Sequence, residues 1–451
     1  MTSYTAAAIV DTSPHPPSDI SASATSNGKS KRSEFLVLKG SSATNGATKF
    51  LKPKRNRKKK EYTRKLQASP QLLDIVVGNF DFAKGFSKGG AINQLLVNNG
   101  AGGYDEADVE DLPGGTLDTG SIVVADVNED GFDDIIVGNV GNNQLLLNNG
   151  NNTFTVGTLP GGTSFTLSIA TADVNNDGFD DIIVGNGGGG QANQLLINNG
   201  AGTFTVETLP GGTLDTASIA TADVNNDGFE DIIVGNFFSQ ANQVLINNGD
   251  GTFTASDLPG GDLDTRSIAT ADVNNDGFED IIVGNSLVLD DIIVGQANQV
   301  LINNGDNTFT ALDLPGGDLV TTSITTADVD DDGDIDIIVG NSVQANQLLI
   351  NNGNGAFTVS DLPGGDLSTF SIATADVDDD GFDDILVGND SGQANQVLIN
   401  NGAGTFTNET LPGGALSTAS IAVIRTAPAP PAPAPASTSE YTILYDGILI
   451  G

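Results

Sequence analysis

The stretch DVNNDGFDDIIVGN, from Asp173 to Asn186, joins a nine-residue acidic loop directly to an apolar strand. Oxygen-bearing side chains stand at alternate positions, at Asp173, Asn175 and Asp177, and Asp181 ends the loop. A glycine between them, Gly178, permits the sharp bend that brings these oxygens together. A hard cation that prefers six to eight oxygen ligands suits this arrangement, and calcium is the first candidate.

This acidic loop recurs six times at a spacing near fifty residues. The six loops begin at Asp126, Asp173, Asp223, Asp272, Asp328 and Asp376. Each repeat has four strand-like segments: an inner segment such as SIATADV, the apolar DIIVG, the segment QLLIN, and the alternating TFTVETL that follows an Asn-Gly turn and leads into LPGG. A period of this length with four strands is typical of a β-propeller blade.

The number of blades follows from counting the segments. LPGG occurs seven times and the segment that starts with Gln also occurs seven times, although the acidic loop occurs six times. The first repeat begins part-way, at Leu72, and SIAVIR at Ser420 to Arg425 supplies its missing inner strand. We therefore predict an all-β fold, a seven-bladed β-propeller over residues 71–425 that is closed by its N- and C-terminal strands. In the closing repeat Arg425 stands at the first loop position and Asp74 at the last, which predicts an ion pair in place of a cation.

The two flanking regions have compositions unlike the repeats. Residues 1–70 carry 14 of the 18 Lys and Arg residues and are rich in Ser, Thr and Ala, so we predict a disordered arm, basic at 52–65. The basic run is typical of a solvated arm, and a nuclear signal or an anion-binding tail remains open. Residues 426–451 form a Pro-rich linker and a short tail.

Composition excludes several classes of function. Residues 71–451 contain 4 basic and 54 acidic side chains, so the propeller surface is not expected to bind nucleic acid. No apolar run is long enough for a transmembrane segment, and no secretory signal pattern is visible. The chain has no Cys and a single His, His15, so no Ser-His or Cys-His set is possible in the fold. We predict that the protein is not an enzyme, although a pair of carboxylates of the glycosidase type remains open.

The residues that match DxDxDGxxD resemble the FG-GAP and VCBS repeats of integrin-α-like propellers, and the resemblance covers residues 71–425. It implies up to six structural calcium ions, each bound by the side chains at loop positions 1, 3, 5 and 9 and by the backbone carbonyl at position 7. The implied side-chain ligands are Asp126, Asn128, Asp130 and Asp134; Asp173, Asn175, Asp177 and Asp181; Asp223, Asn225, Asp227 and Asp231; Asp272, Asn274, Asp276 and Asp280; Asp328, Asp330, Asp332 and Asp336; and Asp376, Asp378, Asp380 and Asp384. The implied carbonyls belong to Phe132, Phe179, Phe229, Phe278, Asp334 and Phe382. The last two loops have four carboxylates instead of three, so they are expected to bind calcium most tightly.

The face opposite the acidic loops is expected to bind a ligand. The loops after VGN vary most in length, and this face gathers most of the basic side chains of the repeats with several aromatic ones: Phe80, Phe82, Phe86, Phe237, Phe238, Lys84, Lys88 and Arg266. The duplicated DIIVG between 280 and 295 leaves open which copy pairs in its blade.

The resemblance implies a calcium-binding, non-catalytic adhesion or protein-interaction module, extracellular or at the cell surface, and we expect a monomer. The alternative is a carbohydrate-binding propeller, because certain mushroom lectins are seven-bladed propellers similar to this one. A polysaccharide-active enzyme is the less favoured hypothesis.

Overall fold

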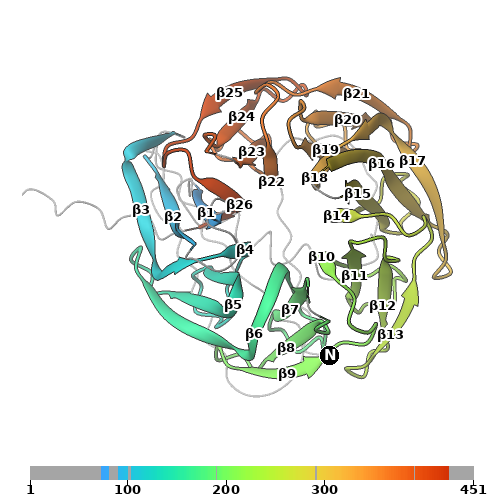
Figure 1. The fold of residues 1–451 in the computed structure, drawn as a ribbon, viewed down its shortest axis with the longest axis horizontal. Coiled ribbons are helices and arrows are strands. Elements are labelled where there is room, and N and C mark those ends of the chain that lie inside the picture. Colours follow the sequence, from blue (N-terminus) through green and yellow to red (C-terminus); the bar gives the residue numbers. More distant parts are fainter. Residues whose placement is uncertain are drawn as a thin grey trace, which may run out of the picture. The chain divides into compact units, whose positions relative to one another are not determined.

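The computed structural model describes residues 73–80, 90–99, 103–188, 190–289, 292–390 and 392–425. This part of the chain contains 26 β-strands, which form a ring of sheets (Figure 1). Among the described residues no helix has the length and apolarity needed to cross a membrane. The predicted disordered arm at 1–70, its basic run at 52–65 and the tail at 426–451 lie outside the described residues.

Five of the six sheets have four strands, and the first and last described strands pair in one of them. This closing sheet has the order β26-β1-β2-β3, and the red strand β26 lies beside the blue strand β1 in Figure 1. Its strands are β26 Ser417–Ile424, β1 Asp74–Phe80, β2 Ala91–Asn98 and β3 Tyr104–Leu117. Asp74 pairs with Ile424 and Val77 with Ile421, so the predicted closure of the propeller by N- and C-terminal strands is confirmed.

Four further sheets each take four consecutive strands. Their bounds are β10 Thr216–Ala222, β11 Asp231–Asn236, β12 Gln243–Asn247 and β13 Phe253–Asp257; β14 Thr265–Ala271, β15 Asp280–Leu289, β16 Ile292–Asn303 and β17 Phe309–Leu319; β18 Thr321–Ala327, β19 Asp336–Asn341, β20 Gln347–Asn351 and β21 Phe357–Asp361; β22 Thr369–Ala375, β23 Asp384–Asn389, β24 Gln396–Asn400 and β25 Phe406–Thr410.

The sixth sheet has six strands and departs from the prediction of seven separate blades. Its strands are β4 Thr119–Ala125, β5 Asp134–Asn148, β6 Phe154–Ala172, β7 Asp181–Asn186, β8 Gln194–Asn198 and β9 Phe204–Thr208. The 19-residue strand β6 is responsible, because its Phe154–Phe165 part pairs with β5 and its Thr166–Ala172 part pairs with β7. The structure therefore has six sheets, since β6 runs unbroken from the outer edge of one repeat into the inner edge of the next.

The inner edges of the sheets are joined by a repeated hydrogen bond. A serine hydroxyl on each inner strand accepts the backbone N–H of an isoleucine on the inner strand of the next repeat, at 2.9 to 3.2 Å. The pairs are Ile122 with Ser420, Ile169 with Ser121, Ile219 with Ser168, Ile268 with Ser218, Ile324 with Ser267, Ile372 with Ser323, and Ile421 with Ser371. The last pair leads back to the first, so these bonds form a closed ring.

The apolar core consists of seven clusters, each between two neighbouring repeats. The DIIVG strands are buried along their whole length, as their continuous apolar run predicts, and the outer strand β9 is mostly exposed. Glycine is required where a DIIVG strand meets the inner strand of the next repeat. A Cβ on Gly235 of β11 would lie 2.8 Å from Ile268 Cδ1 and from Thr265 Cγ2. The sheets therefore approach one another more closely than any larger residue would allow.

The duplicated DIIVG extends a hairpin. The first copy pairs within the sheet, with Ile281 opposite Thr270 and Val283 opposite Ile268. The second copy continues the β15–β16 hairpin beyond the sheet, through pairs from Ser286 with Gly295 to Leu289 with Ile292. The extra residues thus lengthen two strands and leave the register of the blade unchanged.

Candidate metal sites

Each acidic loop connects an inner strand to the buried strand beside it, and its own backbone holds the acidic side chains in place. In the loop from Asp173, the two oxygens Oδ1 and Oδ2 of Asp173 accept the N–H groups of Asp177 at 3.0 Å and Gly178 at 2.9 Å. Asn175 Oδ1 accepts from Asp177 at 2.8 Å, and Asp177 Oδ1 accepts from Phe179 at 3.0 Å. The chain therefore curls around the oxygens of positions 1, 3 and 5, as the sequence pattern predicts.

Two residues of each loop have left-handed backbone conformations. The position-6 glycines have φ of 93° to 99°, which explains why glycine stands there. Position 4 has φ of 57° to 62° in all six loops, at Glu129, Asn176, Asn226, Asn275, Asp331 and Asp379. Asparagine tolerates this conformation well, and three of these side chains also reach the next loop. Asn176 Nδ2 donates to Gly228 O at 3.0 Å, Asn226 Nδ2 to Gly277 O at 2.9 Å, and Asn275 Nδ2 to Asp334 Oδ1 at 2.7 Å.

The position-9 aspartates are fully buried carboxylates. Asp134 has no exposed surface, and its Oδ1 accepts the Asn148 N–H at 2.7 Å while its Oδ2 accepts the Val127 N–H at 3.3 Å. Burial, with smaller contributions from the charges of Asp130 and Asp126, raises the pKa of Asp134 to about 7. Burial likewise raises the pKa to about 7 in Asp181, Asp231 and Asp384, and to about 6 in Asp280 and Asp336. These buried carboxylates would be stabilised in their charged form by a cation.

Two buried oxygens support the fit of a metal ion. Asp181 Oδ2 and Asp330 Oδ1 have no hydrogen-bond partner among the described residues. A backbone N–H lies near each of them, from Val174 and Asp332, but outside hydrogen-bond geometry. A buried oxygen left unpaired is costly, and a coordinated cation would remove that cost.

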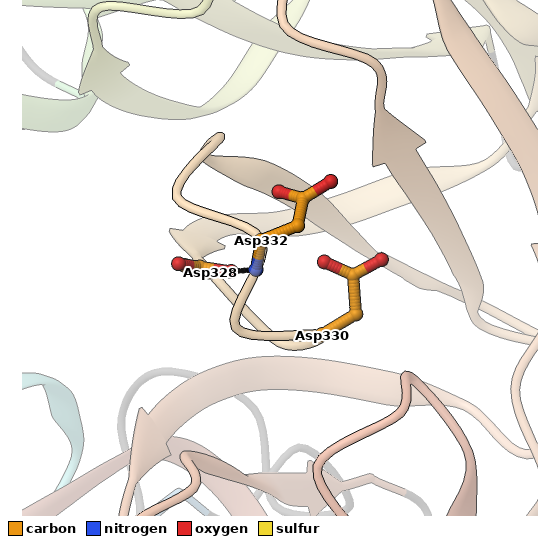
Figure 2. Close-up of side chains that lie close together, drawn as sticks. All are labelled: Asp328, Asp330 and Asp332. Atoms are coloured by element: carbon orange, nitrogen blue, oxygen red, sulfur yellow. Dashed lines mark hydrogen bonds between the residues drawn. The ribbon is translucent and has the colours of Figure 1, made fainter.

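The carboxylates are brought together in the last two loops. One oxygen from each of Asp328, Asp330 and Asp332 lies within 4.8 Å of the other two, and Asp376, Asp378 and Asp384 form a second such group. Figure 2 shows the first three projecting from a single turn, with the Asp332 N–H donating to Asp328 Oδ1 at 3.1 Å. Hard oxygen donors at this spacing fit calcium better than softer metals. The structure thus brings together carboxylates from the predicted ligand sets, and the ions themselves and the position-7 carbonyls stay predictions.

The aromatic side chain at position 7 has a role that sequence reasoning missed. A Cβ on Gly200 would lie 2.3 Å from the ring of Phe179, so this ring covers the glycine of the following NNG turn. Phe132, Phe229, Phe278 and Phe382 cover Gly150, Gly249, Gly305 and Gly402 in the same way. The sequence contained a sign of this contact, because repeats with Phe at position 7 also have Gly in the following NNG turn.

The first asparagine of each NNG turn was also missed. Asn198 N–H donates to Asp181 Oδ1 at 2.7 Å, and its side-chain Nδ2 donates to Val127 O at 2.8 Å and Asp180 O at 3.0 Å. The residue therefore fixes the position-9 carboxylate of its own repeat and binds the acidic loop of the preceding one. Only the recurrence of NNG in every repeat pointed to such a function.

The closing sheet lacks the acidic loop. Asp74 is buried, and its Oδ1 accepts the Asn98 N–H at 2.7 Å, as the position-9 aspartates do in other repeats. Arg425 is exposed, and its backbone N–H donates to Asp133 Oδ2 at 3.3 Å. The ion pair between Arg425 and Asp74 stays a prediction.

Phe237, Phe238 and Arg266 lie together on the face opposite the acidic loops, and we call this cluster the aromatic corner. Phe238 is 58% exposed with φ of 59°, and its ring centroid lies 4.2 Å from that of the buried Phe237. The Arg266 guanidinium lies over the Phe237 ring, 5.4 Å from its centroid, and burial lowers the pKa of Arg266. Phe80 and Phe237 are buried, so Phe238 is the exposed ring among the described members of the predicted aromatic set. Phe82, Phe86, Lys84 and Lys88 lie outside the described residues.

A shallow recess of about 270 Å³ lies between the closing sheet and the next one. Leu95, Glu110, Asp111 and Leu112 line it from one side, and Phe154 with its two preceding residues lines it from the other. The recess combines the carboxylates of Glu110 and Asp111 with the ring of Phe154, and none of these residues belongs to an acidic loop.

Comparison with known families matches the repeats. The FG-GAP-like repeat family matches residues 126–184, 173–234, 223–283 and 328–387, and the FG-GAP repeat family matches residues 265–302. Together these matches span more than half of the chain. No curated protein matches the sequence.

Solved structures match the propeller at low sequence identity. An Agrocybe aegerita lectin, described for its recognition of non-reducing terminal N-acetylglucosamine, is 22% identical with a TM-score of 0.53, over 78% of this chain and 95% of the lectin. The periplasmic gluconolactonase of Pseudomonas aeruginosa is 13% identical with a TM-score of 0.52, over 79% of this chain and 99% of that one. An ancestral GH74 enzyme is 12% identical with a TM-score of 0.52, over 75% of this chain and 46% of that one. At these identities the likeness concerns the fold alone.

Proposed function

Because this chain belongs to the FG-GAP repeat proteins and folds as a β-propeller, we propose that it is a calcium-stabilised, non-catalytic interaction module. The observation that carries the proposal is the buried position-9 carboxylate, which recurs in all six acidic loops with its pKa raised by burial. A fold that buries six acidic groups without a basic partner in the same loops gains stability from cations.

In this proposal calcium binds at up to six loops. Positions 1, 3, 5 and 9 supply side-chain oxygens, and position 7 supplies a carbonyl. The ion holds the inner strand and the buried strand of a blade together and has no catalytic role. Residues 71–425 then form one domain of seven repeats, with the six-stranded sheet counted as two repeats that share β6.

The ligand of the module is a protein or a glycan on the face opposite the acidic loops, and the protein acts outside the cell or at its surface as a monomer. The corner of Phe237, Phe238 and Arg266 supports this choice of face. Phe238 is exposed and has a left-handed backbone conformation, and residues with such strained conformations are concentrated at binding sites.

A carbohydrate-binding propeller is the second candidate. It is favoured by the fold shared with the Agrocybe aegerita lectin and by the recess that places Glu110 and Asp111 near Phe154. Aromatic rings beside polar groups are the usual components of sugar sites. A polysaccharide-active enzyme is the least supported function.

Thermal unfolding of the full chain, followed by circular dichroism, tests the calcium proposal. We expect the melting temperature to be markedly higher in millimolar calcium than in metal-free buffer, because only the folded state has assembled sites. Equal melting temperatures in the two buffers would contradict it. Glycan and protein arrays probed with calcium-loaded protein then distinguish the two candidate ligands, and a Phe238→Ala variant reports whether the aromatic corner is used.

A further inference from the structure

In five of the six acidic loops, position 8 lies against the acidic loop of the preceding repeat. Asn247 Nδ2 donates to Glu230 O at 3.1 Å and to Val174 O at 2.7 Å, and these carbonyls belong to position 8 of one loop and position 2 of the loop before it. Two carbonyls bound by one amide group must be close neighbours. The side-chain amides of Asn198, Asn303, Asn351 and Asn400 each donate the same pair of hydrogen bonds. Position 8 is therefore fixed beside the residue that follows the first ligand of the preceding loop.

The closing sheet shows where the position-8 side chain reaches. Ile424 pairs with Asp74 as Ala172 pairs with Asp181, so Arg425 occupies the place that Asp173 holds in a complete loop. Asp133 is position 8 of the next repeat, and its Oδ2 accepts the Arg425 N–H at 3.3 Å. At this junction a position-8 carboxylate contacts the first loop position of the repeat before it.

We propose that the position-8 carboxylates Asp180, Glu230, Glu279 and Asp383 each supply an additional oxygen to the calcium site of the preceding loop, so that these ions bind two neighbouring repeats at once. The inference rests on the proposed calcium sites and adds a ligand that the loop pattern does not contain. The sites that gain this carboxylate are those that begin at Asp126, Asp173, Asp223 and Asp328.

A buried, unpaired oxygen supports the proposal at one of these sites. Asp181 is fully buried, and its Oδ2 has no hydrogen-bond partner among the described residues. It closes the loop that begins at Asp173, and Glu230 is the position-8 residue of the following repeat. An ion at this site would complete the coordination of Asp181 and offset the charge of Glu230 at the same time.

The chain contains its own comparison sites. The loop that begins at Asp272 is followed by Ile335 at position 8, and the loop that begins at Asp376 is followed by Leu73. Neither residue can bind a cation, although Ile335 O accepts the same asparagine bond at 3.0 Å. The loop from Asp272 also has an asparagine, Asn274, at position 3, so it has the fewest carboxylates and should bind calcium most weakly.

Calcium titration of the full-length protein by isothermal calorimetry tests the inference. We expect Glu230→Gln to weaken one site by about tenfold, because one coordinating charge is lost. The matched control is Glu207→Gln on the exposed outer strand β9, which should bind calcium as the unsubstituted protein does. Ile335→Glu should strengthen the weakest site.

Melting in metal-free buffer separates ligation from a structural role. Glu230→Gln should lower the melting temperature in calcium, and this loss should be smaller in metal-free buffer, because the proposed role of the carboxylate requires the ion. Unchanged calcium affinity in Glu230→Gln, or an equal loss of stability with and without calcium, would overturn the inference while leaving the loop sites in place. Failure of the unsubstituted protein to bind calcium would instead overturn the proposed function together with this inference.

Discussion

At the scale of single residues, the sequence predicted the turn of each acidic loop but not the asparagine contacts that hold neighbouring loops together. The spacing of Asp173, Asn175, Asp177 and Gly178 predicts a turn that gathers oxygens, because every bond that shapes it is local. The contact of Asn198 with Val127 joins residues 71 positions apart, and no local pattern predicts such a pairing. Sequence reasoning therefore predicted the turn that gathers the candidate ligands within a loop and missed the asparagines that connect one loop to the next.

The stability of the metal-free protein should rise as the pH falls from 7 toward 4. Six position-9 aspartates have pKa values raised to about 6 or 7 by burial, so the folded state holds protons that the unfolded chain releases above about pH 4. This contribution to the free energy of unfolding is present at low pH and is lost as the pH rises through 6 to 7. Urea unfolding of metal-free protein at pH 5 and pH 7.5 measures it.

Calcium should reverse this order, because the ions bind the charged carboxylates. Lower stability at pH 5 than at pH 7.5 in the metal-free protein would contradict the prediction.

The substitution Asp181→Asn should change stability in opposite directions with and without calcium. Removal of a buried charge stabilises the metal-free fold, whereas loss of a ligand weakens the calcium-loaded one. Melting temperatures in both buffers test this, with the exposed Asp366→Asn as the control. A fall in both buffers would indicate that the asparagine disrupts packing around Asn198.

At the scale of strands and sheets, the structure differs from the prediction at β6 and answers a question that the sequence left open at the duplicated DIIVG. The strand β6 continues through its LPGG sequence into the next inner strand, and this merges two expected blades into one sheet. The hairpin of β15 and β16 absorbs a duplicated segment without a change of register. Both outcomes depend on pairing partners, which a periodic sequence leaves undetermined.

The close approach of neighbouring sheets should make Gly235→Ala destabilising, by about 1–3 kcal/mol, because the added methyl group overlaps Ile268 and Thr265. Gly157→Ala is a matched control, since the nearest atom to its Cβ would be Leu145 O at 3.6 Å. Urea unfolding in calcium compares the two variants. Equal effects would show that the sheets can move apart without cost.

Deletion of residues 287–293 should leave the ring intact. The deletion joins Ser286 to Val294 and gives this loop the same length as the loop from Asn389 to Gln396. All pairs of the first DIIVG copy with β14 are retained, so the melting temperature should change by no more than a few degrees. A large fall would show that the extended hairpin supports the sheet beneath it.

At the scale of the ring, closure depends on one strand. The ring of serine-to-isoleucine bonds includes two that involve β26, through Ser420 and Ile421. The closure was predictable because the first repeat lacked an inner strand and the last residues supplied one. The hydrogen-bonded ring was not, since serine in a small-residue strand carries no distinctive signal.

A chain that ends at Thr410 should fail to unfold cooperatively, because β1 loses its partner strand and the ring opens. A chain that ends at Arg425 keeps every described contact and should melt as the full-length protein does. Calorimetry of both truncated chains makes the comparison, and a sharp transition in the shorter one would show that six repeats suffice.

The pairing of β1 with β26 also determines when folding can finish during synthesis. The ribosome makes β1 first, and the strand that completes its sheet is made only after all the intervening repeats. The six-stranded sheet and the four regular sheets can form as their residues emerge, but the first sheet must stay incomplete until the end. Its exposed edge offers a pairing site to the inner strands of other, nearly identical repeats in the meantime. Among the inner strands, β26 alone has isoleucine at its last position, at Ile424, where the other six have Ala, and this difference can help to select the correct partner.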